Sequence, residues 1–184
     1  LEALLDVLSS VTHHTRDKVV QAVLADGFLD RLLHLLEELE GDGQGENEHH
    51  HHARLHALFR VVRGLVTLSE PVLIATLLSD RHVAKTFGVL EYDPDYADLA
   101  EQRTKYRLYL ARKHLFKTAV PIRCEATLRQ IHLSFRLAYL RDVVMARYID
   151  DGCFATVREM MASQAVEILG HLESDPDLLP GIFR

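Results

Sequence analysis

The stretch Leu55-His-Ala-Leu-Phe-Arg-Val-Val-Arg-Gly-Leu-Val66 decides the fold class of this chain. Its large apolar side chains recur every three or four positions, which places them on one stripe of a helix over 53–68. The leucines of 28–40 follow the same spacing. We find no segment with the strict alternation of apolar and polar residues that is typical of a half-buried strand. These patterns predict an all-α protein.

Start and stop signals divide the chain into roughly nine to ten helices. Pro71 lies early in a first turn, where no intrahelical N–H is required, and Gly27 and Gly152 separate neighbouring helices. The predicted spans are 1–12, 16–26, 28–40, 53–68, 71–79, 81–89, 96–114, 126–145, 153–161 and 164–172. Short connections between helices of this length indicate an armadillo- or HEAT-like solenoid. A compact helical bundle is the alternative, because no repeat of fixed period is evident.

Length and composition favour one soluble domain over 1–184, cut from a longer chain. Leu1 already begins a helical pattern, and no apolar run approaches the roughly 18 residues of a membrane span. The two cysteines, Cys124 and Cys153, lie 29 positions apart and indicate no disulfide framework. This usage fits a reducing compartment.

Residues 41–52 form a Gly-rich, acidic segment that ends in four consecutive histidines. Such composition predicts a flexible loop. His52 and His56 have helical i, i+4 spacing, but a zinc site needs three or four ligands held rigidly. Because most of these histidines lie in the predicted loop, we expect no metal site. No cofactor is expected either.

Catalytic signatures are missing from the sequence. It contains no GxSxG motif and no glycine-rich phosphate loop. Glu91 and Asp93 are neighbouring carboxylates, but Asp93 followed by Pro94 is typical of a turn that enters a helix. We therefore do not expect an enzyme, although a metal-dependent hydrolase that uses the histidines is a third hypothesis.

The net charge of −6 conceals a basic middle segment, because residues 103–147 hold 11 basic and only 2 acidic side chains. Such a field attracts acidic surfaces, phosphopeptides or nucleic acid, whereas the structural alternative is a solvated face. Aromatic residues interleave with the basic ones, which on a helix is more typical of core packing than of base stacking. Nucleic acid is therefore not an expected partner.

The helix predicted over 126–145 is apolar on two faces, one with Phe135 and the other with Leu137. A helix of this kind is usually packed between neighbours. We therefore expect it in the interior, with Phe135 buried. Arg136 and Asp142 lie six positions apart, so each is expected to bond a neighbouring helix rather than the other.

Three stretches carry a resemblance to a known family: Gly88-Val-Leu-Glu-Tyr-Asp-Pro94, Phe116-Lys-Thr-Ala-Val-Pro-Ile122, and the spaced set that begins at Ile131-His132. Together they resemble the SMEK domain of regulatory subunit 3 of protein phosphatase 4. The similarity covers about residues 28–172, and the family usually has Cys in place of Val89 and Lys in place of Gln130. The residues that match the family motifs are Glu91, Tyr92, Asp93, Pro94, Phe116, Pro121, Ile131, His132, Phe135 and Asp142.

The resemblance implies a non-catalytic regulatory subunit that helps to assemble a serine/threonine phosphatase and to target its substrates. Its implied partners are the phosphatase catalytic subunit, regulatory subunit 2 and, indirectly, phosphoprotein substrates, in the nucleus and the cytoplasm. The alternative is a generic helical-repeat adaptor that binds acidic or phosphorylated partners. The candidate partner-binding residues are Arg103, Lys105, Arg107, Arg112, Lys113, Lys117, Arg136 and Tyr139.

Overall fold

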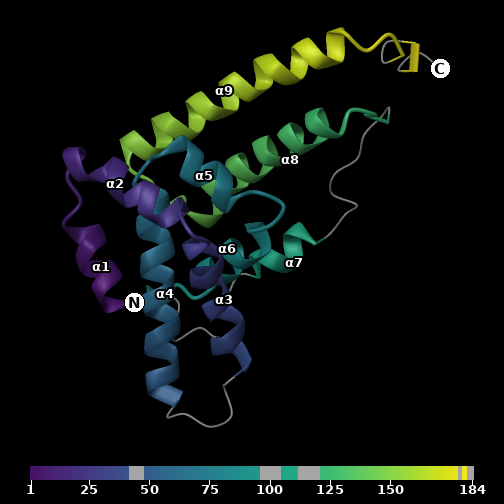
Figure 1. Cartoon of the computed structure of the whole chain (residues 1–184). Helices are drawn as coiled ribbons and strands as arrows, with labels where there is room; N and C mark the ends of the chain where they lie inside the picture. The colour runs from purple at the N-terminus through teal and green to yellow at the C-terminus, as the bar shows by residue number, and fades with distance from the viewer. Residues whose placement is uncertain (42–47, 96–104, 112–120, 178–179, 182–184) are drawn as a thin grey trace. The chain divides into compact units, whose positions relative to one another are not determined.

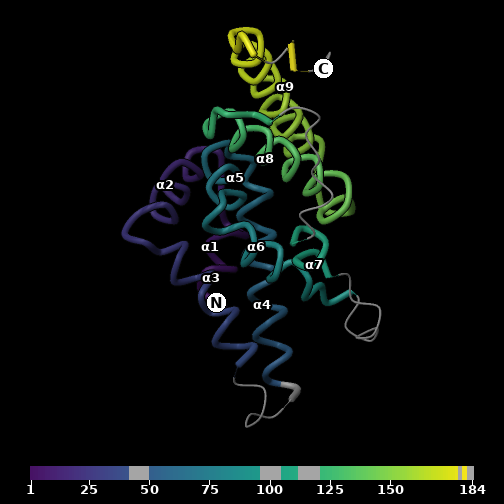
Figure 2. Tube along the Cα trace, turned by 90° about the vertical axis from the view of Figure 1, so that its right-hand side faces the viewer, coloured from purple at the N-terminus to yellow at the C-terminus, as the bar shows by residue number. Residues whose placement is uncertain are grey.

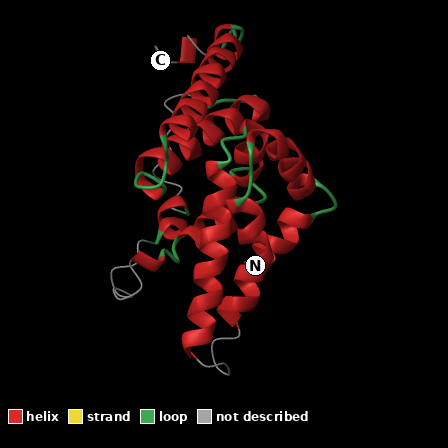
Figure 3. Cartoon of the chain, turned by 90° about the vertical axis from the view of Figure 1, so that its left-hand side faces the viewer, coloured by secondary structure: helices red, strands yellow, loops and turns green. Residues whose placement is uncertain are grey.

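The computed structural model describes residues 1–41, 48–95, 105–111, 121–177 and 180–181. All regular structure in these ranges is helical (Figure 3), as the sequence predicts. The chain divides into two compact units, Leu1–Leu110 and Ala111–Arg184, and each is described by itself. The expectation of a single domain over 1–184 stays a prediction.

Unit 1 is built around one long helix (Figure 1). Its helices are α1 (Glu2–Ser9), α2 (His13–Leu24), α3 (Phe28–Gly41), α4 (Glu48–Thr67), α5 (Pro71–Leu77), α6 (Val83–Leu90) and α7 (Tyr106–Leu110). Helix α4 packs against α1, α3, α5 and α6, and α3 also packs against α2 and α6. This succession of packed helices is consistent with a solenoid.

The predicted apolar stripes form the core of unit 1. Leu58 and Val62 of α4 are fully buried, as is Leu33 of α3. Helix α1 approaches α4 closely where Gly64 has no side chain, because a Cβ there would lie 3.1 Å from Cδ1 of Leu8. The leucine spacing and the small residue together fix how these helices pack.

The short connections of unit 1 follow ordinary turn chemistry. Between α2 and α3 the chain turns through left-handed backbone at Asp26 (φ 51°) and Gly27 (φ 66°). Helix α5 begins with Pro71 in its first turn, which confirms the predicted start. These turns place the end of α5 and the start of α6 beside α3, where the site described below lies.

In the described residues of unit 2, two helices lie side by side (Figure 2), α8 (Glu125–Tyr139) and α9 (Asp151–Glu173). Helix α8 continues into a π-helical turn, η3 (Leu140–Val144), in which the N–H of Met145 donates to the carbonyl of Leu140 over 2.8 Å. The side chain of Asp150 caps α9 by accepting from the N–H of Cys153 over 2.7 Å. None of the helices in the described ranges is long and apolar enough to cross a membrane.

Several predicted boundaries are wrong. The spans 153–161 and 164–172 form the single helix α9, because no residue between them breaks the helix. In the predicted loop over 41–52, residue 41 ends α3 and residues 48–52 already belong to α4, while 42–47 lie outside the described residues. Of the helix predicted over 96–114, the described part contains α7 alone.

The expected interior position of α8 is also wrong in part. Leu137 is fully buried, but Phe135 is 38% exposed. Ring centroids of Phe135 and Tyr139 lie 6.3 Å apart in a stacked arrangement, which covers one face of each ring. Helix α8 thus buries one of its two apolar faces more fully than the other, because it packs on α9 along one side.

Candidate functional site

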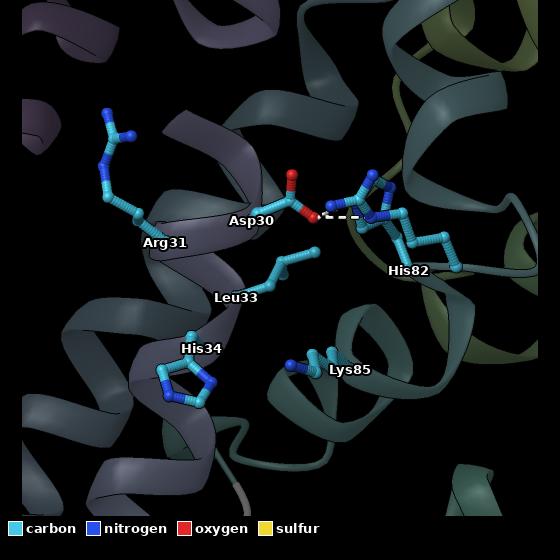
Figure 4. A pocket seen from close by; sticks show the side chains of 7 residues that line it. Asp30, Arg31, Leu33, His34, His82 and Lys85 are labelled. Carbon is cyan, nitrogen blue, oxygen red and sulfur yellow. Dashed lines mark hydrogen bonds and ion pairs between the residues drawn. The ribbon is translucent and has the colours of Figure 1, made fainter. Parts of the chain in front are cut away.

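A groove lies between α3 and the segment that joins α5 to α6 (Figure 4). Its volume is about 390 Å³. It is named here the α3–α6 groove, and the residues that line it are Asp30, Arg31, Leu33, His34, Arg81, His82 and Lys85. Most of these side chains are basic, although the segment that contains them was not predicted as a site.

His82 connects the two sides of the groove. Its Nε2 lies 2.9 Å from Oδ1 of Asp30 on α3, and its Nδ1 lies 3.0 Å from the carbonyl oxygen of Thr76 at the end of α5. Ser79 Oγ lies 3.3 Å from the same Nδ1. Both ring nitrogens of His82 have polar partners, one on α3 and one at the end of α5. His82 therefore anchors the α5–α6 turn to α3.

Asp30 is the acidic centre of this arrangement. Its Oδ1 also forms an ion pair with Arg81, at 2.8 Å from Nε. The hydrogen bond from His82 lowers the pKa of the Asp30 carboxyl; desolvation opposes this shift, and the charge of Arg81 adds to it. A single carboxylate oxygen thus holds both Arg81 and His82 in place.

Lys85 and His34, which line the groove, both pair with Glu37 of α3. Lys85 Nζ lies 3.0 Å from Oε1 of Glu37, and Nδ1 of His34 lies 2.8 Å from Oε2 of the same carboxylate. The hydrogen bond from Lys85 lowers the pKa of Glu37. Because Glu37 and Lys85 lie on α3 and α6, this pair joins the two helices that frame the groove.

A separate network in unit 1 accounts for one predicted partner-binding residue. Arg107 donates from Nη2 to Oε2 of Glu91 and to Oε1 of Glu40, each over 2.8 Å, and its N–H donates to Glu91 Oε1 over 2.8 Å. The Glu91 side chain is only 4% exposed. The hydrogen bonds that Arg107 donates to Glu40, with a further contribution from those to Glu91, raise the pKa of Arg107. Arg107 was expected to be exposed for a partner, but it neutralises a buried carboxylate of its own unit.

The first family motif is explained by the same network. A Cβ at Gly88 would lie 2.7 Å from Cδ2 of Leu36 and 2.9 Å from Cδ of Arg107, so the missing side chain admits both. Tyr92 donates from its hydroxyl to Oε1 of Glu40 over 2.8 Å. Asp93 accepts from the N–H of Asp95, as the predicted turn requires. The motif joins α3, α6 and α7, and its carboxylates are used structurally.

The other predicted site residues differ in their exposure and in their partners. Lys105 is exposed, and Arg136 and Tyr139 are half-buried on α8. Asp142 pairs with its neighbour Arg141, Nε to Oδ1 over 2.6 Å, so the expected bond from Asp142 to another helix is wrong. Half-buried positions also hold Pro94, Ile131 and His132, whereas Pro121 is exposed. Arg103, Arg112, Lys113, Phe116 and Lys117 lie outside the described residues. Partner binding by this set stays a prediction.

In the part of the chain that the structure describes, no three His, Cys, Asp or Glu side chains are grouped so that they could hold a metal ion. His52 and His56 make an edge-to-face ring contact, with centroids 6.4 Å apart, on α4. Their i, i+4 spacing thus brings the two rings into contact on the surface of α4.

Sequence reasoning missed the groove because its partners are distant in the chain. Asp30 and His82 are 52 positions apart. Their only local signal is the Asp-Arg and Arg-His pairs at 30–31 and 81–82, which are common on solvated surfaces. The packing of α3 against α6 is what brings the two pairs together.

Comparison with known proteins gives a consistent result. A family model described as Phosphatase 4 regulatory subunit 3 matches residues 1–184. Suppressor of Mek1 from Dictyostelium discoideum is 27% identical over 168 residues, which cover 91% of this chain and 15% of that protein. An uncharacterized protein of Schizosaccharomyces pombe is 30% identical over 99% of this chain and 20% of its own length. Serine/threonine-protein phosphatase 4 regulatory subunit 3 of Drosophila melanogaster is 26% identical over 91% of this chain and 16% of its own length. No solved structure matches significantly.

Proposed function

Because the chain belongs to the phosphatase 4 regulatory subunit 3 family, we propose that it forms part of a non-catalytic regulatory subunit of a serine/threonine phosphatase 4 complex. The observation that carries this proposal is the family match over all of residues 1–184. The chain spans no more than 20% of the length of the three relatives described above. Its role is accordingly that of one helical segment of a larger subunit.

The partners of this segment are the phosphatase catalytic subunit and regulatory subunit 2, with phosphoprotein substrates reached indirectly. The residues that carry out phosphate hydrolysis belong to the catalytic partner. A scaffold of packed helices supports this role, because such folds present extended surfaces to other proteins. The complex acts in the nucleus and the cytoplasm.

Affinity purification tests the assignment. The chain is expressed with an affinity tag in eukaryotic cells, and the captured proteins are identified by mass spectrometry. We expect the phosphatase catalytic subunit and regulatory subunit 2 to be enriched over a control variant, Leu33→Asp, which places a charge in the fully buried core of unit 1. Capture of neither subunit by the folded chain, or equal capture by both proteins, contradicts the proposal.

A further inference from the structure

The α3–α6 groove offers more cationic groups than its own acids occupy. Five of its seven lining side chains are Arg, Lys or His, and Asp30 is the one acid among them. Leu33 supplies the apolar floor. Glu37 reaches the groove only through its ion pairs with Lys85 and His34. An anion that enters the groove therefore meets several positive groups at short range.

Side chains that carry hydrogen-bond donors line this space. The Arg81 side chain is 73% exposed, and its Nε lies 2.8 Å from Oδ1 of Asp30. Arg31 donates from Nη1 to the carbonyl of Asp26 over 2.6 Å, which leaves its other guanidinium nitrogens available. Lys85 forms an ion pair with Glu37. Two arginines and a lysine thus line the groove.

These donors are held in place before any ligand arrives. Asp30 fixes Arg81 and His82, and His82 is fixed in turn by the carbonyl of Thr76. Arg31 and Lys85 lie on two different helices, α3 and α6, that pack against each other. Because the cations are restrained by the fold, an anion binds them with less loss of side-chain freedom.

We propose that the α3–α6 groove binds the phosphoryl group of a phosphorylated serine or threonine side chain in a segment of a partner protein. A guanidinium donates two parallel hydrogen bonds to a phosphoryl group, and a phosphoryl group offers three strong acceptor oxygens and more charge than a carboxylate. A groove of about 390 Å³ admits one such side chain at an open surface. The choice of a phosphoprotein as the partner rests on the function proposed above, whereas the groove itself is argued from the structure alone.

The test measures binding to the purified chain by fluorescence anisotropy at low salt. Three labelled peptides are compared, which have a single phosphoserine, serine or glutamate between glycine and alanine residues. We expect the phosphoserine peptide to bind at least about tenfold more tightly than either of the others. Inorganic phosphate should displace it. Equal binding of the glutamate peptide, or of the serine peptide, overturns the proposal.

Variants then locate the site. The pair Arg81→Ala with Lys85→Ala should weaken binding of the phosphoserine peptide by about tenfold or more. The matched control removes one Arg and one Lys elsewhere, Arg60→Ala with Lys18→Ala, which are exposed on α4 and α2 and lie outside the groove. An equal loss of affinity in the control variant would show that only net charge matters, and it would refute binding in the α3–α6 groove.

A conservative change and a fold control complete the design. Arg81→Lys keeps the charge but loses the planar fork, so it should weaken phosphoserine binding by an intermediate amount. Circular dichroism melts check that each variant is folded. Since this assay needs no phosphatase subunit, its failure leaves the purification test unaffected, and the groove variants can be carried through that test separately.

Discussion

At the scale of single residues, Arg107 belongs to the fold more than to the surface. It was expected to contact a partner, yet it spans α7, α6 and α3 by pairing with Glu91 and Glu40. Glu91 is buried, and a buried carboxylate is costly unless a cation and hydrogen bonds satisfy it. Arg107 therefore serves inside the folded unit, because its charge neutralises the buried carboxylate of Glu91.

Replacing Arg107 with alanine should therefore destabilise the chain. We expect a loss of about 2 kcal/mol in the free energy of unfolding, below the cost of a fully buried pair because the side chain is 34% exposed and its N–H still serves Glu91. Arg60→Ala, at an exposed position, should change it by less than about 0.5 kcal/mol. Urea unfolding measures both, and equal values for the two variants would contradict a structural role for Arg107.

Asp30 gives a prediction about pH. Its folded pKa lies below the ordinary value, so its interactions stabilise the fold above the unfolded pKa of about 3.9 and are lost as pH falls through the folded pKa. Asp30→Asn should be less stable than the wild type at neutral pH. The difference between the two should then shrink as the pH is lowered below about 4. Denaturant titrations across this range measure it, and a difference that stays constant down to the acid end would sink the idea.

At the scale of elements, α8 differs most from its sequence pattern. Both of its faces are apolar in sequence, but the side chains at 135 and 137 differ sharply in burial. The helix also ends in the π-helical turn η3, which shifts the angular position of the residues after Tyr139. Apolar periodicity therefore identified the helix without deciding which stripe is covered.

Alanine substitutions on α8 should separate the two stripes. Phe135→Ala should cost about 1 kcal/mol, since it removes a stacked ring that is partly in water. Leu137→Ala should cost about 2–5 kcal/mol, since it leaves a cavity in fully buried surroundings. Thermal and urea unfolding compare them. A larger loss for Phe135 would show that its ring is covered in solution.

Two helical glycines should respond in opposite directions to alanine. Gly88→Ala forces its methyl group against Leu36 and Arg107 and should destabilise by about 1–3 kcal/mol. Gly170→Ala on α9 meets nothing within 4 Å and should stabilise by about 0.5–1 kcal/mol, because alanine has the higher helix propensity. Unfolding free energies test the pair. Stabilisation by both substitutions would mean that the close approach at Gly88 relaxes without cost.

At the scale of the whole molecule, the chain consists of two helical units and belongs to the phosphatase 4 regulatory subunit 3 family. Unit 1 has a continuous core around α4 and carries both the α3–α6 groove and the Arg107 network. The described part of unit 2 contains α8 and α9, and Asp150 caps the start of α9. Binding surfaces on a rigid helical core are typical of scaffold proteins.

The purified chain should show no phosphatase activity, because the family assigns it a regulatory role. Incubation with a phosphoserine peptide should release phosphate only at the rate of a blank without protein. The assay uses tag-free protein with and without divalent metal ions. Turnover above the blank that is abolished by His52→Ala or His56→Ala would overturn this expectation and revive the hydrolase hypothesis.

The sequence by itself determined the helical class, the stripes of α3 and α4, the start of α5 and the family. These are local properties, because a helix repeats every 3.6 residues and its backbone bonds close within four positions. The leucines of α3 that share a stripe are all buried, as their spacing predicted. The family motifs are likewise short runs that can be recognised without knowledge of their partners.

Only the tertiary structure decided which charged side chains are available to a partner. Arg107 is 16 positions from Glu91 and 67 from Glu40, and Asp30 is 52 from His82. No local pattern encodes such pairs, because they form only when α3, α6 and α7 pack together. Packing left the Arg81 side chain largely exposed and gave Arg107 a buried carboxylate to neutralise, although both are arginines in polar segments of the sequence.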